Sequence, residues 1–523
     1  MGNPELVRAN PEAATLNTEA RSKDGSTTLA FKLAGAATEA VASKSVLVNG
    51  QVGPTIAARF YGLMGSALYE SYQIFEDSFK SSLGKKSLSS LIDSAENKAD
   101  NFLKGKGKDF ERDFINNVVL DATVKAMGDE APGAKAIFED VASKNFRDLG
   151  AKANELSSEI SSKIATAIGK YYKKDGATDT LTFKPTNSGP NNVEDLERWT
   201  PEYNVGGEPA SGLQQFLTPQ WGDVRQILGK KELEELKADL KDPEPFLLVK
   251  DADVNLDKGK ITVGDKTKKI SEDLVGKWIN PDFINQAERV VEASADLNPK
   301  QKLIAEFWED GPGTGFPPGT WMEFGKYASE KFDNNLADDA KLFFGIGQSL
   351  LSASVASWGL KTETDYTRPL TAIRELSSLG LLGKKDDITG LYEFDAYSRD
   401  AQKTKRINGI DWETYQTPGN FYSPPFSEFV SGHSTFSSAA GKFIEEITGS
   451  EKFGASVKTT SLIEKNKDIP VKLKWDTWED AWNESGLSRI YGGIHFDDGN
   501  EQGLKLGQEI GSAVFKEVSG LWG

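Results

Sequence analysis

This chain of 523 residues contains only two histidines, and each lies in a short cluster of residues suited to acid–base or anion chemistry. His433 follows Ser431 and Gly432, and the apolar spacing from Phe436 onward predicts that a helix begins there. The free N–H groups and positive dipole end of a helix N-terminus attract anions, and an imidazole exchanges protons near neutral pH. The stretch 423–436 therefore predicts an anion site. Taken alone, Ser-Gly-His is more often an ordinary helix start with an incidental histidine.

The second histidine, His495, follows Arg489 across a double glycine that permits a tight turn. Arg489 and His495 could face one cavity across this turn, and Asp498 is placed to cap a following helix. Small and apolar residues are expected on the inner side of that helix: Gly503, Gly507, Ile510, Gly511 and Val514. For an isolated pair, however, a surface arginine and a hydrogen-bonded core histidine are the commoner arrangement.

Two further cations, Lys361 and Arg368, lie upstream. The uncharged run 342–360 has helical spacing that places Trp358 and Lys361 on its inner face, where a lysine needs an anion. Pro369 disfavours helix at Arg368 and leaves its guanidinium free to bind oxygens. Single Lys and Arg side chains are usually solvated, so the prediction of a site depends on the clusters taken together.

The three clusters resemble, in their order along the chain, the signature of the vanadium-dependent haloperoxidases. They are Lys361-x6-Arg368-Pro369, Ser431-Gly432-His433 and Ser488-Arg489-x5-His495. The signature is shared with the phosphatidic-acid phosphatase superfamily, which includes bacterial acid phosphatases. It covers residues 358–498, and the segments 198–201, 217–221 and 311–321 are also similar to bacterial haloperoxidase-like sequences.

Two positions depart from the family pattern. Val430 stands where a proline is expected before Ser-Gly-His, a change that keeps the N–H donors. Gly499 stands where the family has an acidic residue, four positions after the last histidine, with Asp497 and Asp498 just before it. The residue that orients His495 is therefore left open.

The resemblance implies an all-α (mainly α) fold of two helical bundles with vanadate near the end of the second. It implies that His495 binds vanadium and that His433 is the acid–base residue. Vanadate would be held by three cations and two further donors: Lys361, Arg368, Arg489, the Ser431 hydroxyl and the Gly432 N–H. Lys361 would also polarise the peroxide. The implied reaction oxidises bromide or chloride with hydrogen peroxide to hypohalous acid, which then halogenates small organic nucleophiles.

The same cage would also serve an acid phosphatase of the superfamily, with His495 as the phosphoryl-accepting nucleophile. Trp358 and Phe426 resemble the aromatic halide-pocket residues of chloroperoxidase-like members, although ordinary core packing explains both equally well. The chain is also longer than the small acid phosphatases and lacks the membrane spans of the lipid phosphatases. We therefore favour the haloperoxidase. A silent anion-binding protein would predict a broken cluster, whereas this one is intact.

Composition narrows the class of protein. A net charge of −17 argues against nucleic acids and anionic membranes as partners. The absence of cysteine excludes disulfides, zinc–thiolate sites and thiol catalysis. The N-terminus has no signal-peptide pattern, and the run 342–360 favours a buried core helix over a membrane span. We expect a soluble protein, cytoplasmic or exported by a non-classical route, with homo-oligomerisation left open.

The patterning predicts four regions: a flexible N-terminus (1–25), an N-terminal helical bundle (26–175), a connector with a small hairpin and helices (176–335), and a C-terminal bundle carrying the site (336–523). The hairpin is expected within 246–270 and is the one clear β signal. Helices are predicted at 29–42, 55–75, 88–103, 110–127, 134–146, 151–171, 281–295, 299–308, 320–332 and 336–360.

Overall fold

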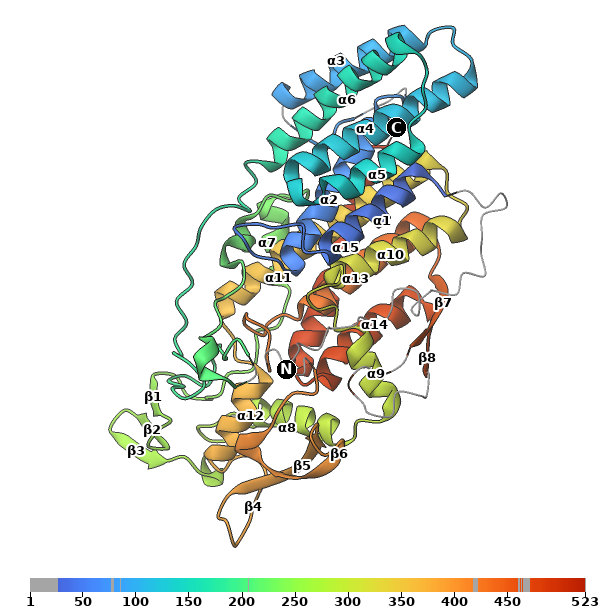
Figure 1. Cartoon of the computed structure of the whole chain (residues 1–523). Helices are drawn as coiled ribbons and strands as arrows, with labels where there is room; N and C mark the ends of the chain where they lie inside the picture. The colour runs from blue at the N-terminus through green and yellow to red at the C-terminus, as the bar shows by residue number, and fades with distance from the viewer. Residues whose placement is uncertain are drawn as a thin grey trace.

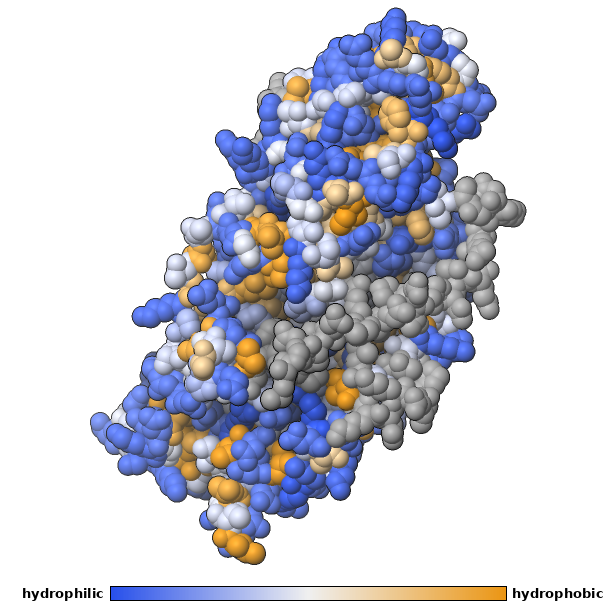
Figure 2. All heavy atoms as spheres, viewed as in Figure 1, coloured by the Kyte–Doolittle hydropathy of each residue, from blue (hydrophilic) through white to orange (hydrophobic). Residues whose placement is uncertain are grey.

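The computed structural model describes residues 27–76, 80–84, 86–205, 207–416, 422–459, 461, 463 and 471–522. The flexible N-terminus predicted for residues 1–25 lies outside these residues. The fold is mainly helical, which confirms the predicted fold class (Figure 1). The face in Figure 2 is largely hydrophilic, with apolar side chains in small scattered groups.

The six helices predicted in the N-terminal region are all present and gather at one end of the molecule (Figure 1). Local signals set two of their starts: the Thr28 hydroxyl accepts a hydrogen bond from the N–H of Phe31, and Pro54 occupies the first position of the second helix. The helices are α1 (Leu29–Ala42), α2 (Pro54–Gln73), α3 (Lys86–Leu103), α4 (Lys108–Glu130), α5 (Lys135–Asn145) and α6 (Ala151–Tyr172).

The long helix α11 (Leu336–Thr364) begins at a capping box formed by Asn335 and Asp338 and is buried through most of its length. It packs along α2 on one side and against the C-terminal helices on the other. Glycines bring α2 and α11 together, because a Cβ on Gly347 would lie 2.5 Å from the Tyr61 carbonyl oxygen. The run 342–360 is thus the predicted core helix. No helix in the described part of the chain has the length and apolarity to cross a membrane.

The C-terminal helices are α12 (Pro369–Ser378), α13 (Gly432–Thr448), α14 (Trp478–Tyr491) and α15 (Asp497–Ser519). Helix α13 packs against α11, α14 and α15 (Figure 1). Gly503, Gly507 and Gly511 lie on the inner side of α15, as predicted, directly against α13. The remaining α-helices are α7 (Lys230–Ala238), α8 (Pro281–Ala295), α9 (Pro299–Phe307) and α10 (Phe316–Lys331).

The small hairpin predicted within 246–270 is present, but β structure extends beyond this one predicted signal. Residues 252–269 form a three-stranded antiparallel sheet, and two further antiparallel sheets occur in the C-terminal region. Strand β6 has the sequence Lys-Thr-Lys-Arg-Ile-Asn, and its first four side chains are exposed. It therefore lacks the apolar alternation that predicts a strand, and backbone pairing with β5 defines it. The strands are β1 (Ala252–Asn255), β2 (Lys260–Val263), β3 (Lys266–Lys269), β4 (Lys384–Lys385), β5 (Tyr392–Ser398), β6 (Lys403–Asn408), β7 (Lys452–Thr459) and β8 (Val471–Thr477).

We expect Gly507→Ala to destabilise the protein. The added Cβ would lie 2.0 Å from the Ser438 hydroxyl oxygen and 2.4 Å from the Thr435 carbonyl oxygen, so α13 and α15 would have to separate. Overpacking of this kind costs about 1–3 kcal/mol. Gly169→Ala in α6 is the matched control, because nothing lies within 4 Å of its added Cβ. Thermal unfolding should give a lower melting temperature for Gly507→Ala and an unchanged or higher one for Gly169→Ala. Equal melting temperatures would contradict the tight α13–α15 contact.

Candidate active site

An extended segment leads into α13 and is held in place by an earlier part of the chain. The N–H of Leu217 donates to the Pro425 carbonyl (2.9 Å), and the Gln214 side-chain amide donates to the Ser423 carbonyl (2.8 Å). Ser431 is the N-cap of α13, and its hydroxyl accepts from the N–H of Ser434 (3.3 Å). The predicted helix start is therefore confirmed.

Lys361 projects from the last turns of α11 and is fully buried. Its ammonium group donates to the carbonyls of Ser427 (3.0 Å) and Glu428 (2.8 Å), which ties α11 to the segment before α13. Burial lowers the pKa of Lys361 well below its ordinary value, and the positive charge of Arg368 lowers it further. An anion beside Lys361 would favour its charged form.

Arg368 is the N-cap of α12 and has the extended backbone that Pro369 predicts. Its guanidinium donates to the carbonyls of Phe426 (2.9 Å), Ser427 (3.1 Å) and Ile494 (2.7 Å). One of its nitrogens, Nη1, also lies 3.2 Å from Nε2 of His495. Burial lowers the pKa of Arg368 to about 9, so the group stays charged at neutral pH.

Arg489 on α14 brings His433 into the same region. Its Nη1 donates to the Trp308 carbonyl (2.8 Å) and lies 2.6 Å from Nε2 of His433. An arginine only donates, so Nε2 of His433 is the acceptor and the ring is neutral with its proton on Nδ1. Burial and the charge of Arg489 together lower the pKa of His433 well below its ordinary value. The Nε and Nη2 groups of Arg489 are buried and have no hydrogen-bond partner.

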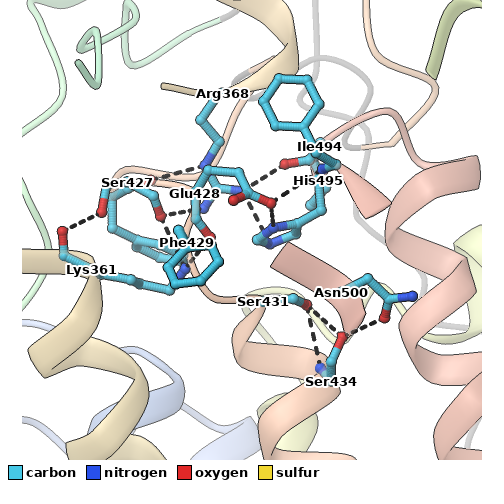
Figure 3. Close-up of polar contacts among 12 residues, drawn as sticks. Lys361, Arg368, Ser427, Glu428, Phe429, Ser431, Ser434, Ile494, His495 and Asn500 are labelled. Carbon is cyan, nitrogen blue, oxygen red and sulfur yellow. Dashed lines mark hydrogen bonds and ion pairs between the residues drawn. The ribbon is translucent and has the colours of Figure 1, made fainter. Parts of the chain in front are cut away.

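His495 lies in the turn between α14 and α15 and is 2% exposed. Its Nδ1 is 2.6 Å from the Glu428 carboxylate, which also accepts the N–H of Phe496 (3.1 Å; Figure 3). Burial lowers the pKa of His495 well below its ordinary value, and the charges of Arg368, Lys361 and Arg489 add to this effect. The ring is therefore neutral, with Nδ1–H directed at Glu428 and the lone pair of Nε2 on the side of Arg368.

The expected cap at Asp498 was wrong. Helix α15 begins at Asp497, its N-cap is Phe496, and no side chain caps it. Asp497 forms an ion pair with Arg289 instead, and neither aspartate holds His495.

The two aromatic residues predicted for a halide pocket lie together. The Trp358 and Phe426 rings have centroids 4.8 Å apart, and the Lys361 nitrogen lies 5.3 Å from the Phe426 centroid and 5.8 Å from that of Trp358. The indole N–H of Trp358 donates to the Leu217 carbonyl (3.0 Å). A Cβ on Gly432 would come within 3.2 Å of the Trp358 ring, so glycine permits the close approach of α13 to this ring.

The structure thus brings together residues from three separate stretches of the chain, 361–368, 427–434 and 489–500. Hydrogen bonds link Lys361 and Arg368 to the Ser427 carbonyl, Arg368 to His495, and Arg489 to His433. The Ser431 hydroxyl lies 2.8 Å from that of Ser434, which lies 2.8 Å from the Asn500 side chain (Figure 3). The charges of Lys361, Arg368 and Arg489 all act on His495, so the three predicted cations lie around one region that also holds both imidazoles.

Glu428 is the residue that the sequence interpretation missed. It is fully buried, and burial raises its pKa to about 7 against the opposing charges of Lys361 and Arg368. The sequence contained a signal for this residue, because Glu428 is the only charged residue apart from the histidine in the stretch 423–436. A charge placed beside a predicted helix start and among apolar residues needs a partner.

Comparison with known proteins identifies the fold. Residues 341–523 match the family model described as the VCPO second helical-bundle domain. A bacterial vanadium-dependent chloroperoxidase crystal structure in its apo form matches with a TM-score of 0.66 at 17% identity, covering 91% of this chain and 95% of that one. The chain has the vanadium haloperoxidase fold. A bacterial vanadium-dependent iodoperoxidase also matches this haloperoxidase fold, with a TM-score of 0.58 at 17% identity over 93% of this chain and 94% of that one.

The holo form of the bacterial chloroperoxidase matches equally, with a TM-score of 0.66 at 16% identity over 90% of this chain and 93% of that one. No curated protein matches the sequence. The predicted resemblance to the vanadium haloperoxidases is confirmed by the matching family model and by the fold.

The residues of this haloperoxidase fold suit a bound vanadate. The Nε and Nη2 donors of Arg489 are buried without partners, so an oxyanion would satisfy groups that otherwise cost free energy. The first N–H groups of α13 point out of the helix and add further donors. The imidazole of His495 offers a neutral nitrogen at Nε2, which is the form that ligates metals. The donor set therefore matches an oxyanion that is also bound through one imidazole.

Proposed function

We propose that this protein is a vanadium-dependent haloperoxidase that oxidises bromide or chloride with hydrogen peroxide to hypohalous acid. One observation supports it most strongly. Three cations, Lys361, Arg368 and Arg489, are each at most 1% exposed, and Glu428 is the carboxylate buried among them. Glu309 and Asp310 also act on Arg489, but both are only half-buried, and the Nε and Nη2 groups of Arg489 have no hydrogen-bond partner. Buried charges are normally paired, so these cations suit a small anion.

In this proposal His495 holds vanadate through Nε2. Lys361, Arg368 and Arg489 neutralise its charge, and the Ser431 hydroxyl and Gly432 N–H donate further hydrogen bonds. Bound vanadate supplies a Lewis acid that activates peroxide toward halide without a change of metal oxidation state.

His433 is the proposed acid–base residue. Its depressed pKa keeps it neutral at physiological pH, so it can accept a proton during peroxide binding. The Glu309 carbonyl lies 3.3 Å from Nε2 of His433, where it can accept the N–H of the protonated ring. Lys361, which an adjacent anion would keep charged, is proposed to polarise the peroxide, and Trp358 and Phe426 are proposed to line the halide site.

Vanadate-dependent halide oxidation is the expected result of the direct test. Metal-free protein is incubated with orthovanadate, and bromination of monochlorodimedone by hydrogen peroxide is followed, with chloride and iodide in parallel. We expect turnover that saturates with vanadate, and none in matched samples without it. An absence of turnover with all three halides, together with hydrolysis of p-nitrophenyl phosphate, would overturn the proposal in favour of the phosphatase.

A further inference from the structure

The Glu428 carboxylate joins two parts of the candidate site. Its Oε1 accepts from Nδ1 of His495 (2.6 Å) and from the N–H of Phe496 (3.1 Å). The backbone carbonyl of the same residue accepts from Lys361 (2.8 Å). The N–H of Glu428 donates to the Tyr366 carbonyl (2.9 Å), which holds the residue against the α11–α12 connection. Both ends of Glu428 are therefore fixed, and its side chain has one orientation toward the imidazole (Figure 3).

Gly499 provides the space for this carboxylate. A Cβ at position 499 would lie 2.1 Å from Oε1 of Glu428 and 2.6 Å from Oε2. No side chain fits there while Glu428 is present. Any side chain at 499 would also point into the volume that the carboxylate now fills, next to Nδ1 of His495. Position 499 is the one where the family pattern has its acidic residue, so here the carboxylate comes from a different part of the chain.

The hydrogen bond from His495 to Glu428 decides which ring nitrogen carries the proton. The charges of Lys361 and Arg368 favour the ionised form of Glu428, which only accepts, so Nδ1 is protonated and Nε2 keeps its lone pair. Nη1 of Arg368 lies 3.2 Å from Nε2 and is compatible with this assignment, but its shorter hydrogen bond goes to the Ile494 carbonyl (2.7 Å). The tautomer therefore depends on the 2.6 Å contact between Nδ1 and Glu428. Partners of this kind fix ring orientation and increase the basicity of a metal-ligating imidazole.

We propose that Glu428 is the positioning residue of His495, and that glycine at position 499 leaves the space that the Glu428 carboxylate occupies. Glu428 holds the ring with Nδ1 protonated and Nε2 turned into the oxyanion cage. The expected effect of Glu428 on vanadate affinity rests on the proposed function, whereas its expected effect on the His495 tautomer does not.

The tautomer of His495 can be measured without vanadate. The chain has only two histidines, so long-range ¹H–¹⁵N spectra of the ¹⁵N-histidine-labelled full chain contain two rings, and His433→Ala assigns them. We expect the wild type and Glu428→Gln to show His495 protonated at Nδ1, because a glutamine oxygen still accepts. Glu428→Ala should lose this single tautomer. If Glu428→Ala keeps the wild-type His495 signals, the proposal is wrong.

A stronger test of this role moves the carboxylate from position 428 to position 499. We expect Glu428→Ala to weaken binding of orthovanadate by about 10- to 100-fold, as loss of such partners typically does. The double variant Glu428→Ala with Gly499→Asp should recover most of that affinity and the wild-type tautomer. Failure of the double variant to recover either, although it melts at the wild-type temperature, would overturn the proposal.

Glu70→Gln is the matched control. Glu70 is also fully buried with one unpartnered oxygen and a pKa raised by burial to about 7, but it lies on α2 and contacts Ser82. Glu70→Gln should change neither the His495 tautomer nor the affinity for vanadate. If its effect equals that of Glu428→Ala, the protein responds generally to the loss of a buried carboxylate, and the proposal is contradicted. If the wild type binds no vanadate, the proposed function fails, while the spectra still decide the role of Glu428.

Discussion

His495→Ala is expected to abolish vanadate binding. In the proposed site Nε2 of His495 is the one protein atom that bonds the metal, and the other groups hold the oxyanion by charge and hydrogen bonds. The ring is presented in its neutral form, because burial and the charges of Arg368 and Lys361 lower its pKa. Equilibrium dialysis against orthovanadate, with ⁵¹V NMR of the retained fraction, measures the loss directly.

The same titration of Glu70→Gln and of the wild type gives the reference affinity. A His495→Ala variant that retains vanadate at the wild-type affinity would remove His495 as the ligand. Binding of phosphate by this variant would show that the three cations alone hold an oxyanion.

His433→Ala is expected to keep vanadate but lose most turnover. The imidazole of His433 contacts Arg489 at 2.6 Å and the Glu309 carbonyl at 3.3 Å, while Glu428 and Arg368 contact the other histidine. Removing a general acid–base residue lowers the rate by about 10²- to 10⁴-fold. Dialysis measures retained vanadate and steady-state halide oxidation measures kcat on the same samples.

The two histidine variants are matched, because each removes one buried or half-buried imidazole next to an arginine. Their opposite expected effects on vanadate binding distinguish a ligand from an acid–base residue. Equal vanadate retention by both would contradict the assigned roles, as would an unchanged kcat in His433→Ala.

Helices and the cation cluster could be predicted from local signals in the sequence. The periodicity of 29–42 and 281–295 gave α1 and α8 with their observed bounds, because caps and prolines lie at the ends of regular apolar stripes. Lys361 was predicted to point inward because it shares a helical face with Trp358. Arg368 was predicted to be extended because Pro369 restricts it.

The partner of His495 could not be predicted in this way. The family pattern has an acidic residue where this chain has Gly499, so the partner was left open, and the nearby Asp497 pairs with Arg289 instead. Glu428 lies 67 positions from His495, and only the packing of α15 over the segment before α13 brings them together. Strand β6 was missed for a related reason: its exposed Lys and Arg residues carry no periodic signal, and pairing with β5 defines it.

A crystal structure of the protein soaked with orthovanadate would show whether His495 and the three buried cations hold vanadate. Anomalous scattering from vanadium locates the ion independently of any assumed coordination. We expect one vanadium bonded to Nε2 of His495, with its oxygens within hydrogen-bond distance of Lys361, Arg368 and Arg489. Vanadium at another position, or no vanadium between these cations at a concentration that saturates the protein in solution, would contradict it.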